Sequence, residues 1–153
     1  MNSDNDIGCK GVQGLSSGII KCTNIQKLTL FLMKDGIQSK GASELGFGLR
    51  RLINLSNLTL NLNENSIQDS GFEDLFLGLQ GLSNLKSLEI QLRQHLTNSL
   101  SNKSAQKIAH ALVKSVSIQT IVLQLLMDQM NKQARSLFKK KLFKAQRLVK
   151  IWI

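Results

Sequence analysis

Asn24-Ile-Gln-Lys-Leu-Thr-Leu-Phe-Leu32 recurs thirty residues later as Asn54-Leu-Ser-Asn-Leu-Thr-Leu-Asn-Leu62, and again as Asn84-Leu-Lys-Ser-Leu-Glu-Ile-Gln-Leu92. Tandem units of about this length are typical of supersecondary repeats that stack in a row, with each unit covering its neighbour. The repetition therefore predicts an elongated array of similar units.

The hydrophobic period changes within each unit. Leu28, Leu30 and Leu32 alternate with other residues, which is the spacing of a strand. Leu45 and Leu49 are four residues apart in the second half of the same unit, which is the spacing of a helix. A strand followed by a helix, repeated in tandem, predicts an α/β fold with parallel strands on one face and helices on the other.

The repeat extends over nearly the whole chain. Run backward, the thirty-residue spacing reaches Ile7, and beyond Leu92 it slips by three within residues 93–104. Gly48 and Gly78 recur inside the predicted helices, where each costs roughly 1 kcal/mol relative to alanine, so we expect them to permit close helix packing. The prediction is one domain, 1–153, with a partial repeat 1–22, repeats at about 23–52, 53–82, 83–115 and 116–145, and a partial repeat 146–153.

The motif Leu55-x-x-Leu58-x-Leu60, with Asn63 or Asn65 and then Ile67-x-x-x-Gly71, resembles the leucine-rich repeat. Its length and helical half resemble the ribonuclease-inhibitor-like subclass. The resemblance implies a short curved horseshoe, an α/β solenoid with parallel strands on the concave face and helices on the convex face. It also implies a non-catalytic scaffold that binds a protein.

The family's row of asparagines between turns is incomplete in this chain. Asp35, His95 and Asp128 stand at the positions equivalent to Asn65. Inhibition of a ribonuclease, a further family role, fits a basic protein poorly because a basic surface repels a basic nuclease.

Several function classes lack their sequence signals. No stretch approaches the roughly 20 apolar residues of a membrane span, and no apolar run follows Met1. Two cysteines form no disulfide framework, and Cys22 stands at the apolar position of Leu52 and Leu82, which predicts a buried thiol. These features predict a cytoplasmic protein.

Catalytic and metal-binding patterns are also missing. His95 and His110 have no cysteine or carboxylate at metal-ligand spacing. We therefore expect no enzyme activity, no cofactor and no metal.

Strand alternation names a candidate binding surface. If Leu28, Leu30 and Leu32 face the core, the residues between them face the concave side. The predicted partner-binding residues are Thr29, Phe31, Met33, Thr59, Asn61, Asn63, Glu89, Gln91, Arg93, Val122, Gln124 and Trp152. The predicted partner is a protein.

Charge is distributed unevenly along the chain. The net charge is +10, yet residues 1–92 hold eight lysines and arginines against nine acids, and residues 93–153 hold twelve against one. Eight bases crowd into residues 132–150, in the last predicted helix and the start of a fifth predicted strand at Leu148, Ile151 and Ile153. This basic patch consists of Lys132, Arg135, Lys139, Lys140, Lys141, Lys144, Arg147 and Lys150. Core contacts of this helix are predicted for Ala134, Leu137, Phe138, Leu142 and Ala145.

Two interpretations of this basic patch remain open. One is a solvated outer face. The other is contact with an acidic surface, such as a tubulin tail, nucleic acid, an anionic membrane or an acidic protein. The absence of interleaved aromatic residues disfavours single-stranded nucleic acid. The second interpretation makes the protein a structural subunit of a large ciliary or cytoskeletal assembly.

The last turn of the array lacks a predicted cover. We expect Phe138, Leu142, Ile151 and Ile153 to form an apolar end. The prediction is that another chain, self-association or further sequence caps this end.

Overall fold

Helices and strands alternate along the described part of the chain. The computed structural model describes residues 5–93, 100–115, 117–125, 132–143 and 148–152, the last of these through the backbone. The helices are α1 (Gly8–Ile19), α2 (Ser39–Leu49), α3 (Asp69–Leu79), α4 (Asn102–Lys114) and α5 (Lys132–Phe143). The strands are β1 (Lys27–Phe31), β2 (Asn57–Asn61), β3 (Ser87–Leu92), β4 (Thr120–Leu125) and β5 (Leu148–Trp152).

The strands form one parallel sheet in chain order, from β1 to β5. Leu58 pairs with both Leu28 and Leu88, thirty residues away on each side, whereas Ser87 pairs with Thr120, thirty-three residues on. The three-residue slip therefore lies between β3 and β4, as the sequence predicted. The α/β class and the parallel sheet are confirmed.

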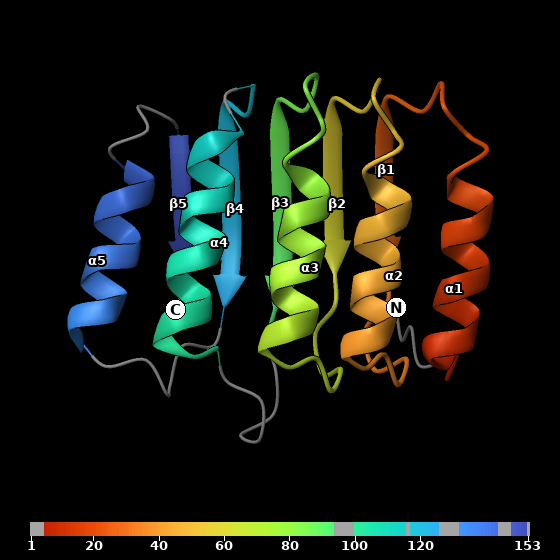
Figure 1. Ribbon diagram of the computed structural model, residues 1–153, viewed down its shortest axis with the longest axis horizontal. Helices are drawn as coiled ribbons and strands as arrows, with labels where there is room; N and C mark the ends of the chain where they lie inside the picture. Colours follow the sequence, from red (N-terminus) through yellow and green to blue (C-terminus); the bar gives the residue numbers. More distant parts are fainter. Residues whose placement is uncertain (1–4, 94–99, 116, 126–131, 144–147, 153) are drawn as a thin grey trace.

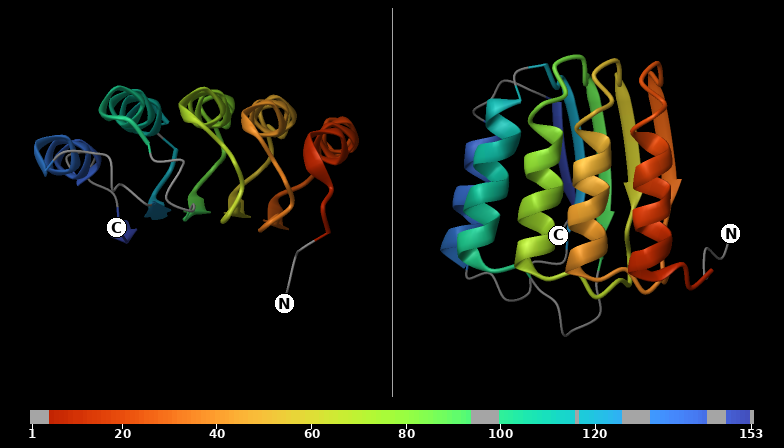
Figure 2. Two further views of the ribbon diagram at one scale, coloured as in Figure 1. Left: turned by 90° about the horizontal axis from the view of Figure 1, so that it is seen from below. Right: turned by 45° about the vertical axis from the view of Figure 1, so that its right-hand side comes forward.

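The helices form a single layer over one face of the sheet (Figure 1). This layer bends around the strands, so the uncovered face of the sheet lies on the inner side of the curve (Figure 2). Between described elements, helices contact the helices before and after them in sequence, and strands contact adjacent strands in the same way.

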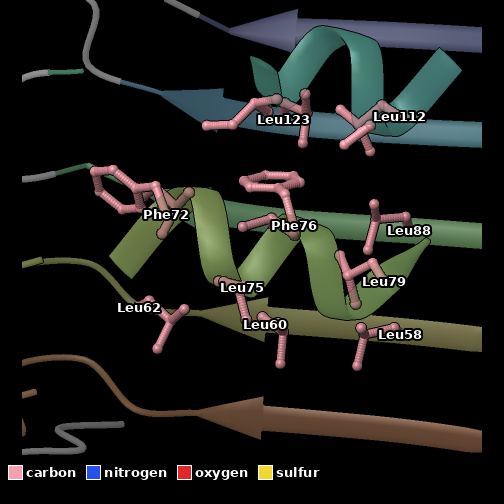
Figure 3. Packing of buried hydrophobic residues seen from close by; sticks show 14 of the residues in the cluster. Leu58, Leu60, Leu62, Phe72, Leu75, Phe76, Leu79, Leu88, Leu112 and Leu123 are labelled. Atoms are coloured by element: carbon pink, nitrogen blue, oxygen red, sulfur yellow. The ribbon is translucent and has the colours of Figure 1, made fainter. Parts of the chain in front are cut away.

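The core fills the space between the two layers. Leu58 and Leu60 of β2 are buried, while Thr59 between them is half-buried on the other face. From α3, Phe72 and Phe76 lie between their own helix and the neighbouring unit that carries Leu112 and Leu123 (Figure 3). The inward side chains of the helices and of the strands thus form one continuous apolar core.

Glycines allow α2 and α3 to approach closely. A methyl group on Gly78 would overlap the carbonyl oxygen of Gly46, and one on Gly46 would lie 2.8 Å from the backbone of Leu75. A methyl group on Gly48 would lie 3.0 Å from Ser16 of α1. The close packing predicted for Gly48 and Gly78 is confirmed, and Gly46 contributes to it as well.

A buried asparagine joins successive turns. Asn65 Oδ1 accepts hydrogen bonds from the backbone nitrogens of Asp35 (3.2 Å) and Ile37 (2.9 Å). Its Nδ2 donates to the carbonyl oxygens of Leu32, Leu62 and Asn63 at 2.6, 3.1 and 3.3 Å. One side chain therefore satisfies backbone groups of two units.

The equivalent Asp35 satisfies only part of this pattern. Its Oδ1 accepts from the backbone nitrogen of Asn5 at 2.8 Å. Its Oδ2 is buried and has no hydrogen-bond partner in the described part of the chain. In Asp35, the carboxylate oxygen Oδ2 occupies the position at which Asn65 has its hydrogen-bond donor Nδ2.

Two sequence predictions about the ends of the array were wrong. Cys22 is exposed, because Leu52 and Leu82 have a described unit on both sides and Cys22 has one on a single side. Phe138 and Leu142 are 2 % and 1 % exposed, because α4 and the sheet already cover them. The side chains of Ile151 and Ile153 lie outside the described residues.

Among the described helices, none is long and apolar enough to span a bilayer.

Candidate protein-binding surfaces

The strand register gathers the predicted binding residues into rows on the inner sheet face. One row contains Thr29, Thr59, Glu89 and Val122, and the next contains Phe31, Asn61, Gln91 and Gln124. Met33, Asn63 and Arg93 follow the ends of β1, β2 and β3. The backbone of Trp152 pairs with Gln124, but its side chain lies outside the described residues. The structure therefore brings the described members of the set to one surface.

Hydrogen bonds fix the polar side chains of this face. Asn61 Oδ1 accepts from the backbone nitrogen of Asn63 at 3.1 Å, and Asn63 Oδ1 accepts from that of Arg93 at 2.7 Å. Gln91 Nε2 donates to Glu89 Oε1 at 3.2 Å. These contacts occupy the oxygens of Asn61 and Asn63 and fix the orientation of both amides, whose amino groups are hydrogen-bond donors.

An apolar side chain begins the second of these rows. Phe31 is 60 % exposed at the edge strand, and Met33 is half-buried close by in sequence. Exposed aromatic residues are enriched at the centres of protein interfaces. The inner face thus combines an apolar group with oriented hydrogen-bonding groups.

The described members of the basic patch lie on two elements. Lys132, Lys140 and the half-buried Arg135, Lys139 and Lys141 belong to α5. Lys150 belongs to β5, where its backbone pairs with Val122, so the strand predicted from Leu148 onward is confirmed. Lys144 and Arg147 lie outside the described residues.

One predicted core contact of α5 was wrong, and another is not described. The buried positions follow a four-residue spacing, Ala134, Phe138 and Leu142, and this spacing leaves Leu137 49 % exposed at the side of the helix. Ala145 lies outside the described residues.

The helix layer carries features that the sequence analysis missed. A groove of about 490 Å³ lies between α2 and α3, beside Phe47 and Leu77. The Arg50 guanidinium carbon lies 4.3 Å from the centre of the Phe47 ring, a cation–π contact. Phe47 and Leu77 are thirty residues apart, so a comparison of the outward helix positions would have revealed them.

Two ionised carboxylates tie α3 to the start of α4. Glu73 accepts hydrogen bonds at 2.5 Å from both Lys107 Nζ and Ser104 Oγ, and these bonds lower the pKa of Glu73. Burial opposes ionisation of Asp69, but hydrogen bonds from Ser101, including one from its backbone nitrogen at 3.0 Å, outweigh burial and lower the pKa of Asp69.

A test of this junction is Glu73→Gln, which should lower the free energy of unfolding by about 1 kcal/mol at pH 7. Because the pKa of Glu73 is lower in the folded than in the unfolded protein, its ionised carboxylate stabilises the fold fully at pH values above the unfolded-state pKa. That stability is lost as the pH falls through the folded-state value, below the ordinary 4.5 of glutamate. Urea titrations should therefore show that the difference in unfolding free energy between the parent and Glu73→Gln becomes smaller toward pH 3. Glu44→Gln on α2 is the control, and an equal deficit at both pH values would contradict the assignment.

No model of a known protein family matches the chain, and no curated protein matches it significantly. Among solved structures, the chain is similar to one described as Leiomodin-1 Actin-Binding Site 2. The two share 15 % identity with a TM-score of 0.65, over 94 % of this chain and 77 % of that one. This likeness concerns the fold.

Proposed function

We propose that the protein is a non-catalytic interaction module of the leucine-rich-repeat class, which binds a protein partner on the inner face of its sheet. The observation that carries this proposal is the set of oriented amides beside the exposed Phe31. The sequential parallel sheet, the single helix layer and the bonds of Asn65 to two turns support the repeat class.

The comparison suggests a first partner for testing. The similar structure is described as an actin-binding site, and actin is a protein partner of a kind that a cytoskeletal module would meet. We therefore propose a cytoplasmic, cytoskeletal setting with actin as the first candidate.

The experiment is a co-sedimentation assay with filamentous actin, accompanied by pull-downs. The triple variant Phe31→Ala/Asn61→Ala/Gln91→Ala should weaken binding at least tenfold, because it removes an exposed aromatic anchor and two polar groups of one row. Thermal denaturation should show little change, since these side chains lie outside the core.

A matched triple on the helix layer, Phe47→Ala/Lys40→Ala/Glu44→Ala, should leave binding intact. If the sheet-face triple leaves every captured partner unchanged, the inner face is not the binding site.

A second proposed role is that of a structural subunit docking an acidic surface, as in a ciliary or cytoskeletal complex. Its support is α5, which carries five lysines and arginines and no acid.

A further inference from the structure

The outward side of the helix layer changes character along the array. Phe47, Leu77, His110 and Lys140 occupy equivalent positions on α2 to α5, at the repeat spacings of thirty and thirty-three. Phe47 and Leu77 are apolar and exposed, His110 presents an exposed imidazole, and Lys140 is basic and exposed. At this position the α2–α3 half of the described helix layer is apolar, although Lys40, Glu44, Arg50 and Asp74 also lie on its outer surface. The α4–α5 half is called the basic half below, and the two halves meet between α3 and α4.

The basic half spans two neighbouring helices. Its lysines and arginines are Lys103, Lys107, Lys114, Lys132, Arg135, Lys139, Lys140 and Lys141. Neither helix contains an aspartate or glutamate. Among the described residues, Lys107 of this set forms an ion pair with Glu73 of α3. This surface is complementary to a partner with several carboxylates.

An apolar groove lies at the boundary between the two halves. It has a volume of about 280 Å³. Its lining residues are Glu73, Leu77 and Gln80 of α3 and Lys107, Ile108, His110 and Ala111 of α4, and Glu73 is paired with Lys107. Leu77 is 56 % exposed, so a partner side chain that entered the groove would remove apolar surface from water. The groove opens beside the basic face of α4.

We infer that this boundary binds an acidic polypeptide segment carrying an apolar side chain. The apolar side chain occupies the groove between α3 and α4, and the carboxylates that follow lie over α4 and α5. The inference deepens the second proposed role and rests on it.

The dimensions of the surface fit such a segment. Neighbouring helices pack about 8–10 Å apart. An extended chain advances about 3.3 Å per residue. Carboxylates roughly three to six residues beyond the apolar anchor therefore reach α4 and α5.

The chemistry favours a polypeptide over a nucleic acid. Phe143 is the exposed aromatic residue of the two helices, so a row of stacking platforms for bases is missing from the described face. A phosphate backbone also offers no apolar group to the groove.

The test measures binding of fluorescent probes to the whole 153-residue chain. The probes are a peptide with one leucine followed by six glutamates, the same peptide with glutamine for leucine, a single-stranded DNA of equal charge, and phosphatidylserine vesicles. The leucine peptide should bind at least tenfold more tightly than the glutamine peptide, because burial of one leucine side chain contributes that much or more.

Variants separate the groove from the charges. Leu77→Gln should abolish the advantage of the leucine peptide. Lys103→Glu/Lys140→Glu should weaken both peptides at least tenfold. Lys10→Glu/Lys40→Glu on α1 and α2 makes the same change in net charge and should have a smaller effect.

The possible failures are distinct. If both peptides bind equally, or if DNA or vesicles bind as tightly as the leucine peptide, the segment inferred for this boundary is wrong, while a basic docking face stands. If the α4–α5 double variant weakens the peptides no more than its control, the second proposed role fails as well. Neither outcome bears on the inner sheet face.

Discussion

Gly78→Ala is expected to lower the free energy of unfolding by about 3 kcal/mol. In an isolated helix the same change would be favourable by roughly 1 kcal/mol. Here the new methyl group would overlap the backbone of Gly46, with the carbonyl carbon only 2.6 Å away. Backbone cannot rotate aside as a side chain can, so α2 and α3 must separate and loosen the core beneath them. Urea denaturation of the variant provides the measurement.

Gly14→Ala provides a control with the opposite sign. A Cβ on Gly14 of α1 meets no atom within 4 Å. The variant should therefore be more stable than the parent by about 0.5–1 kcal/mol, since it gains helix propensity without a steric cost. Similar stabilisation by both variants would show that the α2–α3 contact is looser than described.

Asn65→Asp should cost about 3 kcal/mol or more. The substitution keeps the shape of the side chain and the acceptor for the backbone nitrogens of Asp35 and Ile37. It removes the amide donor and turns an oxygen toward the carbonyl oxygens of Leu32 and Leu62. Several backbone acceptors would then be buried without a donor. The change in unfolding free energy should be measured near pH 7.

The reciprocal variant, Asp35→Asn, should stabilise the protein by about 1 kcal/mol. It would supply a donor at the position where Asp35 Oδ2 is now buried without a partner. Its acceptor oxygen would still serve the backbone nitrogen of Asn5. If Asp35→Asn destabilised the protein as much as Asn65→Asp, the two positions would not be equivalent.

Much of the architecture could be predicted because two independent sequence signals, the apolar alternation and the repeat spacing, indicate it. The apolar alternation of Leu58 and Leu60 sets the strand, and the thirty-residue spacing sets which residues pair across the sheet. The exposure of Cys22 and Leu137 could not be predicted from these two signals. Burial of Cys22 depends on whether a neighbour covers it, and burial of Leu137 depends on the rotation of α5 against α4.

The inner sheet face could be predicted from the sequence, whereas the grooves of the helix layer could not. Alternation alone placed Asn61 and Gln91 on the open face, because side-chain direction in a strand follows directly from sequence parity. The grooves beside Phe47 and Leu77 depend on the distance between helices, which glycine contacts set in three dimensions. The basic half was visible only for α5, since the bases of α4 join it by lying next to it in the fold.

Contacts that join only successive units also shape how the chain folds. Contacts between described helices, and between described strands, link neighbouring units about thirty residues apart, so no such pairing must await the arrival of a distant part of the chain. Folding of such an array can start at any adjacent pair and spread outward. The tightly packed α2–α3 pair is the natural starting point, and elements that pack less closely should be the first to open.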